Sequence, residues 1–143
     1  MKYGIYLESC NNNLINDSII QFNANSGILI QSGEKNDIMG NDINNNDNVG
    51  LDIGSSNGDI TENEIYNNQI GIRLSGSGNT LFENNIRLSS FYGAHGLPAS
   101  KNNVIYDNNF TNKNVYHAYE DGNNQWDNDI VGNYWDDFYG PDP

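Results

Sequence analysis

The chain has 143 residues, of which 17 % are charged and 36 % hydrophobic, and its formal net charge at pH 7 is −13. This charge excludes nucleic acid and anionic membrane surfaces as partners, since both need clustered Lys and Arg, and no apolar run is long enough to insert into a membrane. The hydrophobic fraction is low for a globule but sufficient for a narrow solenoid, and the length predicts a single domain of about six coils over residues 1–143.

A repeat of 21 to 25 residues begins near the N-terminus. Each unit opens with a glycine that is followed by alternating apolar residues, at Gly4-Ile5-Tyr6-Leu7, Gly27-Ile28-Leu29-Ile30, Gly50-Leu51-Asp52-Ile53 and Gly71-Ile72-Arg73-Leu74. A repeat of this length is typical of a solenoid. The chain enters the first unit directly after Met1-Lys2-Tyr3, without a signal peptide. We therefore expect either a piece of a longer secreted protein or molecules that stack end to end through a bare coil.

Three more rows follow the same register. One apolar row is Leu14, Ile38, Ile60, Leu81, Ile105 and Ile130; a second is Ile19, Ile43, Ile65, Ile86, Phe110 and Trp135; the polar row between them is Asp17, Asn41, Asn63, Asn84, Asn108 and Asn133. Alternation over three to five positions indicates short strands, and the glycines and asparagines favour the bends between them. We predict an all-β parallel β-helix with aliphatic columns inside and an asparagine ladder along a bend.

Residues 88–101 interrupt the pattern and predict an irregular coil. This segment combines Phe91 and Tyr92 with His95, and segments that depart from a solenoid repeat often carry its function. We predict these three residues as carbohydrate contacts. The alternative is a widened coil in which Phe91 and Leu97 fill the core.

Residues 115–143 are rich in aromatic and acidic side chains and predict a C-terminal cap. Large rings cover the end of a narrow apolar column well. Aromatic faces beside carboxylates also hold sugar rings, so Tyr119, Trp126 and Tyr139 complete the predicted carbohydrate-binding set. The two roles can coexist.

The same region predicts a metal site of hard oxygen ligands. Calcium needs clustered oxygens, and Asp127, Asp129, Asp136 and Asp137 are the candidate ligands. No EF-hand loop is present, so this prediction rests on composition. Cys10 is the single cysteine and excludes an internal disulfide.

Three segments carry a resemblance to a known family. They are residues 102–110 (NNVIYDNNF), 118–127 (AYEDGNNQWD) and 132–140 (GNYWDDFYG). They resemble the β-helix repeat family that includes NosD and the carbohydrate-binding and sugar hydrolysis repeats of archaeal cell-surface proteins. The resemblance implies a right-handed parallel β-helix, an extracellular or cell-surface location, and an association with polysaccharides or envelope assembly.

The name NosD also implies copper, which the residues do not favour. Soft copper sites combine Cys, Met and His. The candidate donors Cys10, Met1, Met39, His95 and His117 are scattered without metal-binding spacing. Calcium is therefore the only cofactor that we predict.

The favoured function is a non-catalytic extracellular module for carbohydrate contact or envelope assembly. One alternative is a polysaccharide-active lyase or hydrolase, whose site would lie at residues 91–97 or in the C-terminal acidic patch. Its candidate carboxylate pairs are Glu120/Asp121, Asp127/Asp129 and Asp136/Asp137. Adjacent residues of a strand point to opposite faces, however, and basic partners are scarce. The other alternative is a self-assembling filament or surface-layer subunit.

Overall fold

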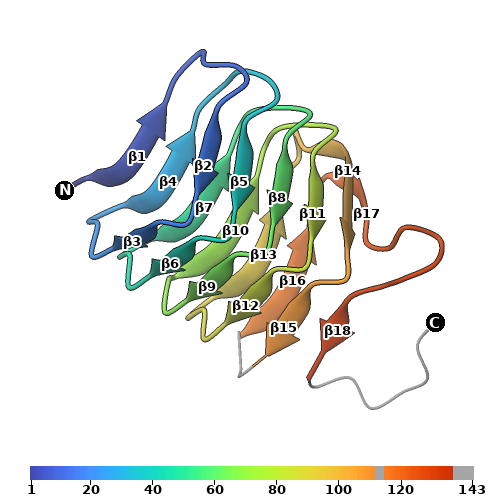
Figure 1. Cartoon of the computed structure of the whole chain (residues 1–143). Helices are drawn as coiled ribbons and strands as arrows, with labels where there is room; N and C mark the ends of the chain where they lie inside the picture. The colour runs from blue at the N-terminus through green and yellow to red at the C-terminus, as the bar shows by residue number, and fades with distance from the viewer. Residues whose placement is uncertain (112–114, 137–143) are drawn as a thin grey trace.

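The computed structural model describes residues 1–111 and 115–136, and these residues form 18 strands without a helix. The strands make three parallel six-stranded sheets, and each turn of the chain contributes one strand to each sheet (Figure 1). The chain winds from one end of this stack to the other, so neighbours within a sheet come from successive coils (Figure 1). The predicted all-β parallel β-helix of about six coils is confirmed.

The three sheets are named here A, B and C. Sheet A contains β1 (Tyr3–Leu7), β4 (Ser26–Ile30), β7 (Val49–Ile53), β10 (Ile70–Leu74), β13 (Tyr92–Gly96) and β16 (Tyr116–Glu120). Sheet B contains β2 (Leu14–Asn16), β5 (Asp37–Met39), β8 (Asp59–Thr61), β11 (Thr80–Phe82), β14 (Lys101–Tyr106) and β17 (Asn123–Gln125). Sheet C contains β3 (Ile19–Gln21), β6 (Asp42–Asn44), β9 (Glu64–Tyr66), β12 (Asn85–Arg87), β15 (Asn109–Thr111) and β18 (Tyr134–Trp135).

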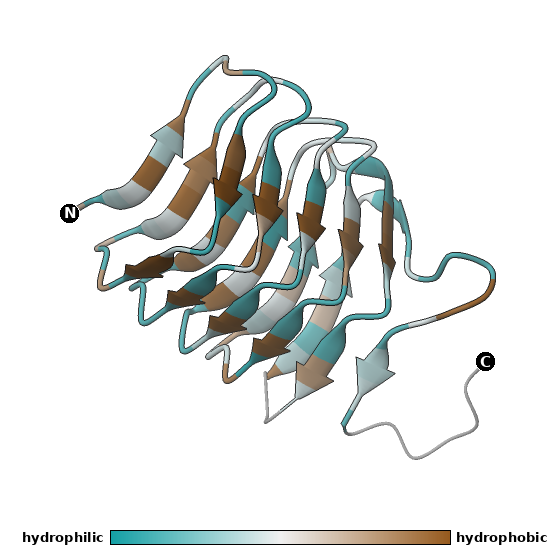
Figure 2. Ribbon diagram, in the orientation of Figure 1, coloured by the Kyte–Doolittle hydropathy of each residue, from teal (hydrophilic) through white to brown (hydrophobic). Residues whose placement is uncertain are grey.

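The core is a set of aliphatic columns inside the three sheets. In sheet A, Leu51 lies between Ile28 and Ile72 of the neighbouring strands, as the glycine-opened units predict. Sheet B supplies Ile15, Ile38, Ile60, Leu81 and Ile105, and sheet C supplies Ile20, Ile43, Ile65, Ile86 and Phe110. Apolar residues stand on the strands and polar residues at most of the bends (Figure 2).

The first coil is shifted by one residue from the predicted rows. Ile15 pairs with Ile38 and Ile20 with Ile43, whereas Leu14 and Ile19 are exposed on the outside. Each of these positions belongs to an apolar doublet, Leu14-Ile15 or Ile19-Ile20, and composition does not tell which member faces inward. The polar row shifts with them, because the backbone N–H of Ser18, and not that of Asp17, donates to Asn41 Oδ1.

The predicted core position of Ile130 is also wrong. Ile130 is 89 % exposed, and its place at the end of the sheet B column is taken by Trp126, which packs against the core. The pairing of Val104 with Gln125 sets this register. Ile130 instead lies in a turn where Asn128 Oδ1 accepts from its N–H.

Asparagine ladders run along all three bends, where the sequence predicted one. The ladder between sheets A and B contains Asn13, Asn36, Asn79, Asn103 and Asn124 and is interrupted at Gly58, whose N–H donates to Asn79 Oδ1; that between B and C contains Asn41, Asn63, Asn84, Asn108 and Asn133; that between C and A contains Asn23, Asn46 and Asn68. Each rung fixes one coil to the next, because a buried amide carries two donors and an acceptor that must be satisfied.

The bends place many non-glycine residues in the left-handed backbone region. Asn45, Asn67 and Leu88 occupy the same bend of successive coils with φ of 51°, 53° and 56°. Asparagine tolerates this conformation, and leucine does so at a cost. The sheet A glycines are needed for space, since a Cβ on Gly50 would lie 2.7 Å from the carbonyl oxygen of Gly71.

Residues 88–101 are more regular than predicted. They include β13, which pairs with β10 in register and places Ala94 beside Ile72. The departure from the repeat is a turn at residues 97–100, closed by the Ser100 N–H and hydroxyl, which both donate to the carbonyl of Leu97. Phe91 does not fill the core, because its side chain is exposed on the outside.

Candidate functional site

The register of sheet A aligns two rows of side chains across all six strands, and the aromatic ends of both rows lie on its outer face. One row is Tyr6, Leu29, Asp52, Arg73, His95 and Tyr119, which the parallel register places on successive strands. The other row is Tyr3, Ser26, Val49, Ile70, Tyr92 and Tyr116. Aromatic residues therefore stand at both ends of the face, and Leu29 and the ion pair of Arg73 with Asp52 stand between them, since Ser26, Val49 and Ile70 are buried.

Five rings gather on β13, β16 and the residue before β13, and we call them the aromatic patch: Phe91, Tyr92, His95, Tyr116 and Tyr119. The ring of Tyr92 is central, with centroid distances of 4.3 Å to Phe91, 4.7 Å to His95, 5.3 Å to Tyr119 and 5.7 Å to Tyr116. Phe91, Tyr116 and Tyr119 are exposed. The patch is thus a continuous aromatic surface that solvent reaches.

Asp121 lines one side of the aromatic patch. Its Oδ2 lies 3.4 Å from Nε2 of His95, whose side chain is 14 % exposed. The negative charge of Asp121 and its hydrogen bond raise the pKa of the Tyr119 phenol. A ring surface beside a carboxylate and an imidazole offers both an apolar face and hydrogen-bonding groups.

The structure brings together four of the six residues predicted to bind carbohydrate: Phe91, Tyr92, His95 and Tyr119. Trp126 is separate, because its ring packs inward against the core. Tyr139 lies outside the described residues. Sequence analysis missed Tyr116 as a member, although its spacing of one repeat from Tyr92 was a usable signal.

The middle of the sheet A face contains a bidentate ion pair. Arg73 Nε donates to Asp52 Oδ1 at 3.0 Å, and the second guanidinium nitrogen donates to Oδ2. The hydrogen bond that the guanidinium donates to Asp52 is the main cause that raises the pKa of Arg73. Asp52 is buried, while the Arg73 side chain retains 31 % exposure. Arg73 can therefore still donate to a bound molecule.

Glu120 points inward and cannot act with its neighbour Asp121. It stands on Gly96 in the sheet A column, and a Cβ on Gly96 would lie 2.5 Å from its Oε2. Its carboxylate accepts from Gly122 N–H at 2.6 Å, from Trp126 Nε1 at 3.1 Å and from the amide of Asn124 at 2.9 Å. These hydrogen bonds join residues of one segment, 120–126 (EDGNNQW), and they hold the turn after the last strand of sheet A together.

The predicted calcium ligands do not come together. Asp127 Oδ1 accepts from the N–H of Asp129 in a local turn, and this hydrogen bond is the main cause that lowers the pKa of Asp127. Asp136, which follows β18, has its Oδ1 2.9 Å from Nε2 of His117 on β16, and Asp137 is outside the described residues. Over residues 1–111 and 115–136, no group of three or more His, Cys, Asp or Glu could hold a metal ion. Calcium is therefore not supported.

The donors that copper would need are also apart. Cys10 lies in a bend of the first coil, where its Sγ donates to the carbonyl of Glu8, and Met39 is on the outside of sheet B. His95 faces outward in the aromatic patch, while His117 lies beside the rings of Phe110 and Trp135. In the part of the chain that the structure describes, these residues do not fit a copper centre.

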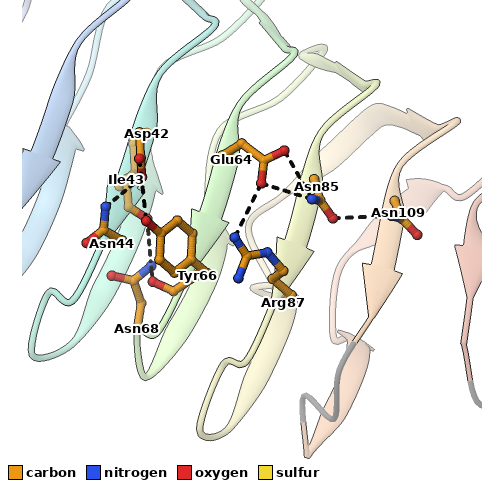
Figure 3. Close-up of polar contacts among 9 residues, drawn as sticks. All are labelled: Asp42, Ile43, Asn44, Glu64, Tyr66, Asn68, Asn85, Arg87 and Asn109. Atoms are coloured by element: carbon orange, nitrogen blue, oxygen red, sulfur yellow. Dashed lines mark hydrogen bonds and ion pairs between the residues drawn. The ribbon is translucent and has the colours of Figure 1, made fainter.

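The outer face of sheet C is polar, and its charged groups are engaged with one another (Figure 3). The amide of Asn85 donates to both Glu64 oxygens at 3.0 and 2.9 Å, and Arg87 lies 3.7 Å from the same carboxylate. The Arg87 guanidinium also covers the ring of Tyr66, at 4.1 Å from its centroid. These contacts occupy the carboxylate and the ring, so we take the aromatic patch on sheet A as the candidate site.

Comparison with known proteins supplies the family. No curated protein and no solved structure matches the chain. No helix of the described residues is long and apolar enough to cross a membrane. One family model, described as periplasmic copper-binding protein (NosD), matches residues 1–140. Its periplasmic description is consistent with a location outside the cytoplasm, as the predicted extracellular or cell-surface location requires. The match covers nearly the whole chain, and the chain therefore belongs to the NosD family.

Proposed function

We propose that the chain is a non-catalytic module outside the cytoplasm that contacts carbohydrate through the aromatic patch. The observation that carries this proposal is the cluster centred on Tyr92, in which exposed rings from two neighbouring strands share one face. Aromatic faces pack on the C–H groups of sugars, and polar groups at the edge of a site fix the orientation of a ligand.

The groups at the edge of the patch suit hydroxyl-rich ligands. The Asp121 carboxylate accepts hydrogen bonds, and His95 beside it can donate or accept according to its tautomer. The face is also built on paired strands, which hold the rings in place at a low entropic cost of binding. Envelope assembly is the broader role that such contact with a cell-surface glycan would serve.

The enzyme alternative is less favoured by the placement of the acidic residues. Glu120 faces the core and Asp121 faces outward, so this pair does not flank one bond of a substrate. Self-association into a filament is a separate alternative. Sedimentation over a range of protein concentrations tests it, because growth into long assemblies would favour the filament and a constant monomer would not.

Binding to an array of unbranched neutral oligosaccharides tests the proposal. The Tyr92→Ala/Tyr119→Ala double variant should lose about tenfold or more in affinity, because both rings contribute stacking. Tyr106→Ala is the matched control, since Tyr106 stacks on Phe82 on the outside of sheet B, away from the patch. Failure of the unmodified chain to bind any glycan, or equal losses in the double variant and the control, would overturn the proposal.

A further inference from the structure

We infer that the glycan is an unbranched neutral chain that lies along the solenoid axis across sheet A, held at its far end by a second aromatic platform, Tyr3 and Tyr6. The inference rests on the proposed function, because it assumes that the aromatic patch binds the other end. It adds a second contact site and a minimum length for the ligand.

The second platform has the form of the first. The rings of Tyr3 and Tyr6 are stacked, with centroids 5.5 Å apart and an interplanar angle of 24°. The Tyr6 side chain is 44 % exposed, the same fraction as that of Tyr119. The Tyr6 hydroxyl donates to Gln31 Oε1 at 2.5 Å.

The two platforms occupy equivalent positions on the first and last strands of sheet A. Tyr6 belongs to the row that ends at Tyr119, and Tyr3 to the row that ends at Tyr116. A carboxylate also follows each outer ring by two residues, Glu8 after Tyr6 and Asp121 after Tyr119. Both ends therefore present a ring and an acceptor for sugar hydroxyls.

The distance between the platforms sets the length of the ligand. β1 and β16 are separated by five steps in the sheet order. Neighbouring strands lie about 4.8 Å apart, similar to the length of one pyranose unit in an extended chain, so the platforms are about 24 Å and roughly five sugar units apart. A disaccharide can contact one platform, whereas a chain of about six units reaches both.

The floor between the platforms suits a neutral chain. Ser26, Val49 and Ile70 are buried, so the groups that a ligand would meet between the platforms are Leu29 and the ion pair of Arg73 with Asp52. The charge of Arg73 is compensated by Asp52, while its partly exposed guanidinium can still donate to hydroxyls. At the two ends, Glu8 and Asp121 are negative and Lys2, whose Nζ lies 5.1 Å from the centroid of the Tyr3 ring, is positive. The ends therefore carry no excess of positive charge that would hold a polyanionic glycan.

The test compares short and long members of the same neutral glycans, of about two and about six units, with single-ring variants. Tyr6→Ala should weaken binding of the long glycans about tenfold and leave binding of the short ones at the aromatic patch unchanged, because only the long chains contact both platforms at once. Tyr119→Ala should weaken binding of both lengths. Tyr6→Phe keeps the ring and should retain binding of the long glycans, and far-UV circular dichroism checks that each variant is folded.

The outcomes separate the two proposals. If Tyr119→Ala weakens binding while Tyr6→Ala leaves the long glycans unaffected, the second platform is wrong and the proposed function stands. A large loss in Tyr6→Phe would overturn the stacking argument. If no glycan of either length binds the unmodified chain, the proposed function fails and the inference fails with it.

Discussion

The asparagine ladders should contribute strongly to stability, and Asn63→Ala tests this. Asn63 is 1 % exposed, and its Oδ1 accepts from both the backbone N–H and the side-chain amide of Asn41, each at 3.0 Å. Its own amide donates to the carbonyls of Ile38 and Thr61 and to Asn84 Oδ1, each at 2.9 Å. One side chain thus joins three successive coils.

The expected loss follows from these partners. The Asn41 backbone N–H would remain buried without its acceptor, at a cost of about 1–3 kcal/mol. The Asn41 amide keeps its bonds to the carbonyls of Ile15 and Met39, so it adds little. The carbonyls of Ile38 and Thr61, which lose Asn63 as a donor, add a smaller cost. In total, the free energy of unfolding should fall by about 3 kcal/mol.

Urea unfolding followed by circular dichroism measures this change, with Asn109→Ala as the matched control. Asn109 is exposed, and its amide makes one bond at 3.2 Å to Asn85, so its removal should cost less than about 0.5 kcal/mol. Solenoids can unfold in parts, and hydrogen exchange at the backbone N–H of Asn41 measures the stability of this part alone. Equal losses in the two variants, or unchanged protection at Asn41, would refute the reasoning.

Three further predictions concern single side chains. Leu88→Asn should raise the free energy of unfolding by about 1 kcal/mol, since asparagine tolerates the φ of 56° at this exposed bend; an unchanged thermal midpoint would contradict it. Gly50→Ala should lower the free energy of unfolding by about 2 kcal/mol, because the new Cβ would clash with the Gly71 carbonyl oxygen; urea unfolding measures the loss. Asp121→Asn should lower the raised pKa of Tyr119 toward its ordinary value, because the negative charge that disfavours the phenolate is removed; NMR titration of labelled tyrosine should show this ring ionising at a lower pH.

The fold could be predicted because its signals are local and repeated. Each strand alternates apolar and polar residues, and each coil returns to the same register, so errors in one coil are corrected by the others. The prediction was wrong where the local pattern is degenerate. At Leu14-Ile15 and Ile19-Ile20 either residue could face inward, and the pairing with Ile38 and Ile43 decides which one does.

The candidate site was predictable in part. The repeat could have placed Tyr92 beside Tyr116 and His95 beside Tyr119, since these pairs are 24 residues apart and successive coils stack in register. The inward direction of Trp126 was not predictable, because it depends on the Glu120 carboxylate that receives its N–H. Composition alone suggested that this tryptophan belonged with the exposed rings.

The sequence by itself therefore determined the β-helix, its six coils and the identity of most core columns, because period and residue type are enough to fix a repeated local structure. The tertiary structure decided which side chains of the last coils face outward. That choice depends on strand register, which pairs residues 24 apart in the chain, and on the partners of partly buried polar groups such as Glu120. The separation of the acidic residues and the gathering of the aromatic patch on one face both follow from it.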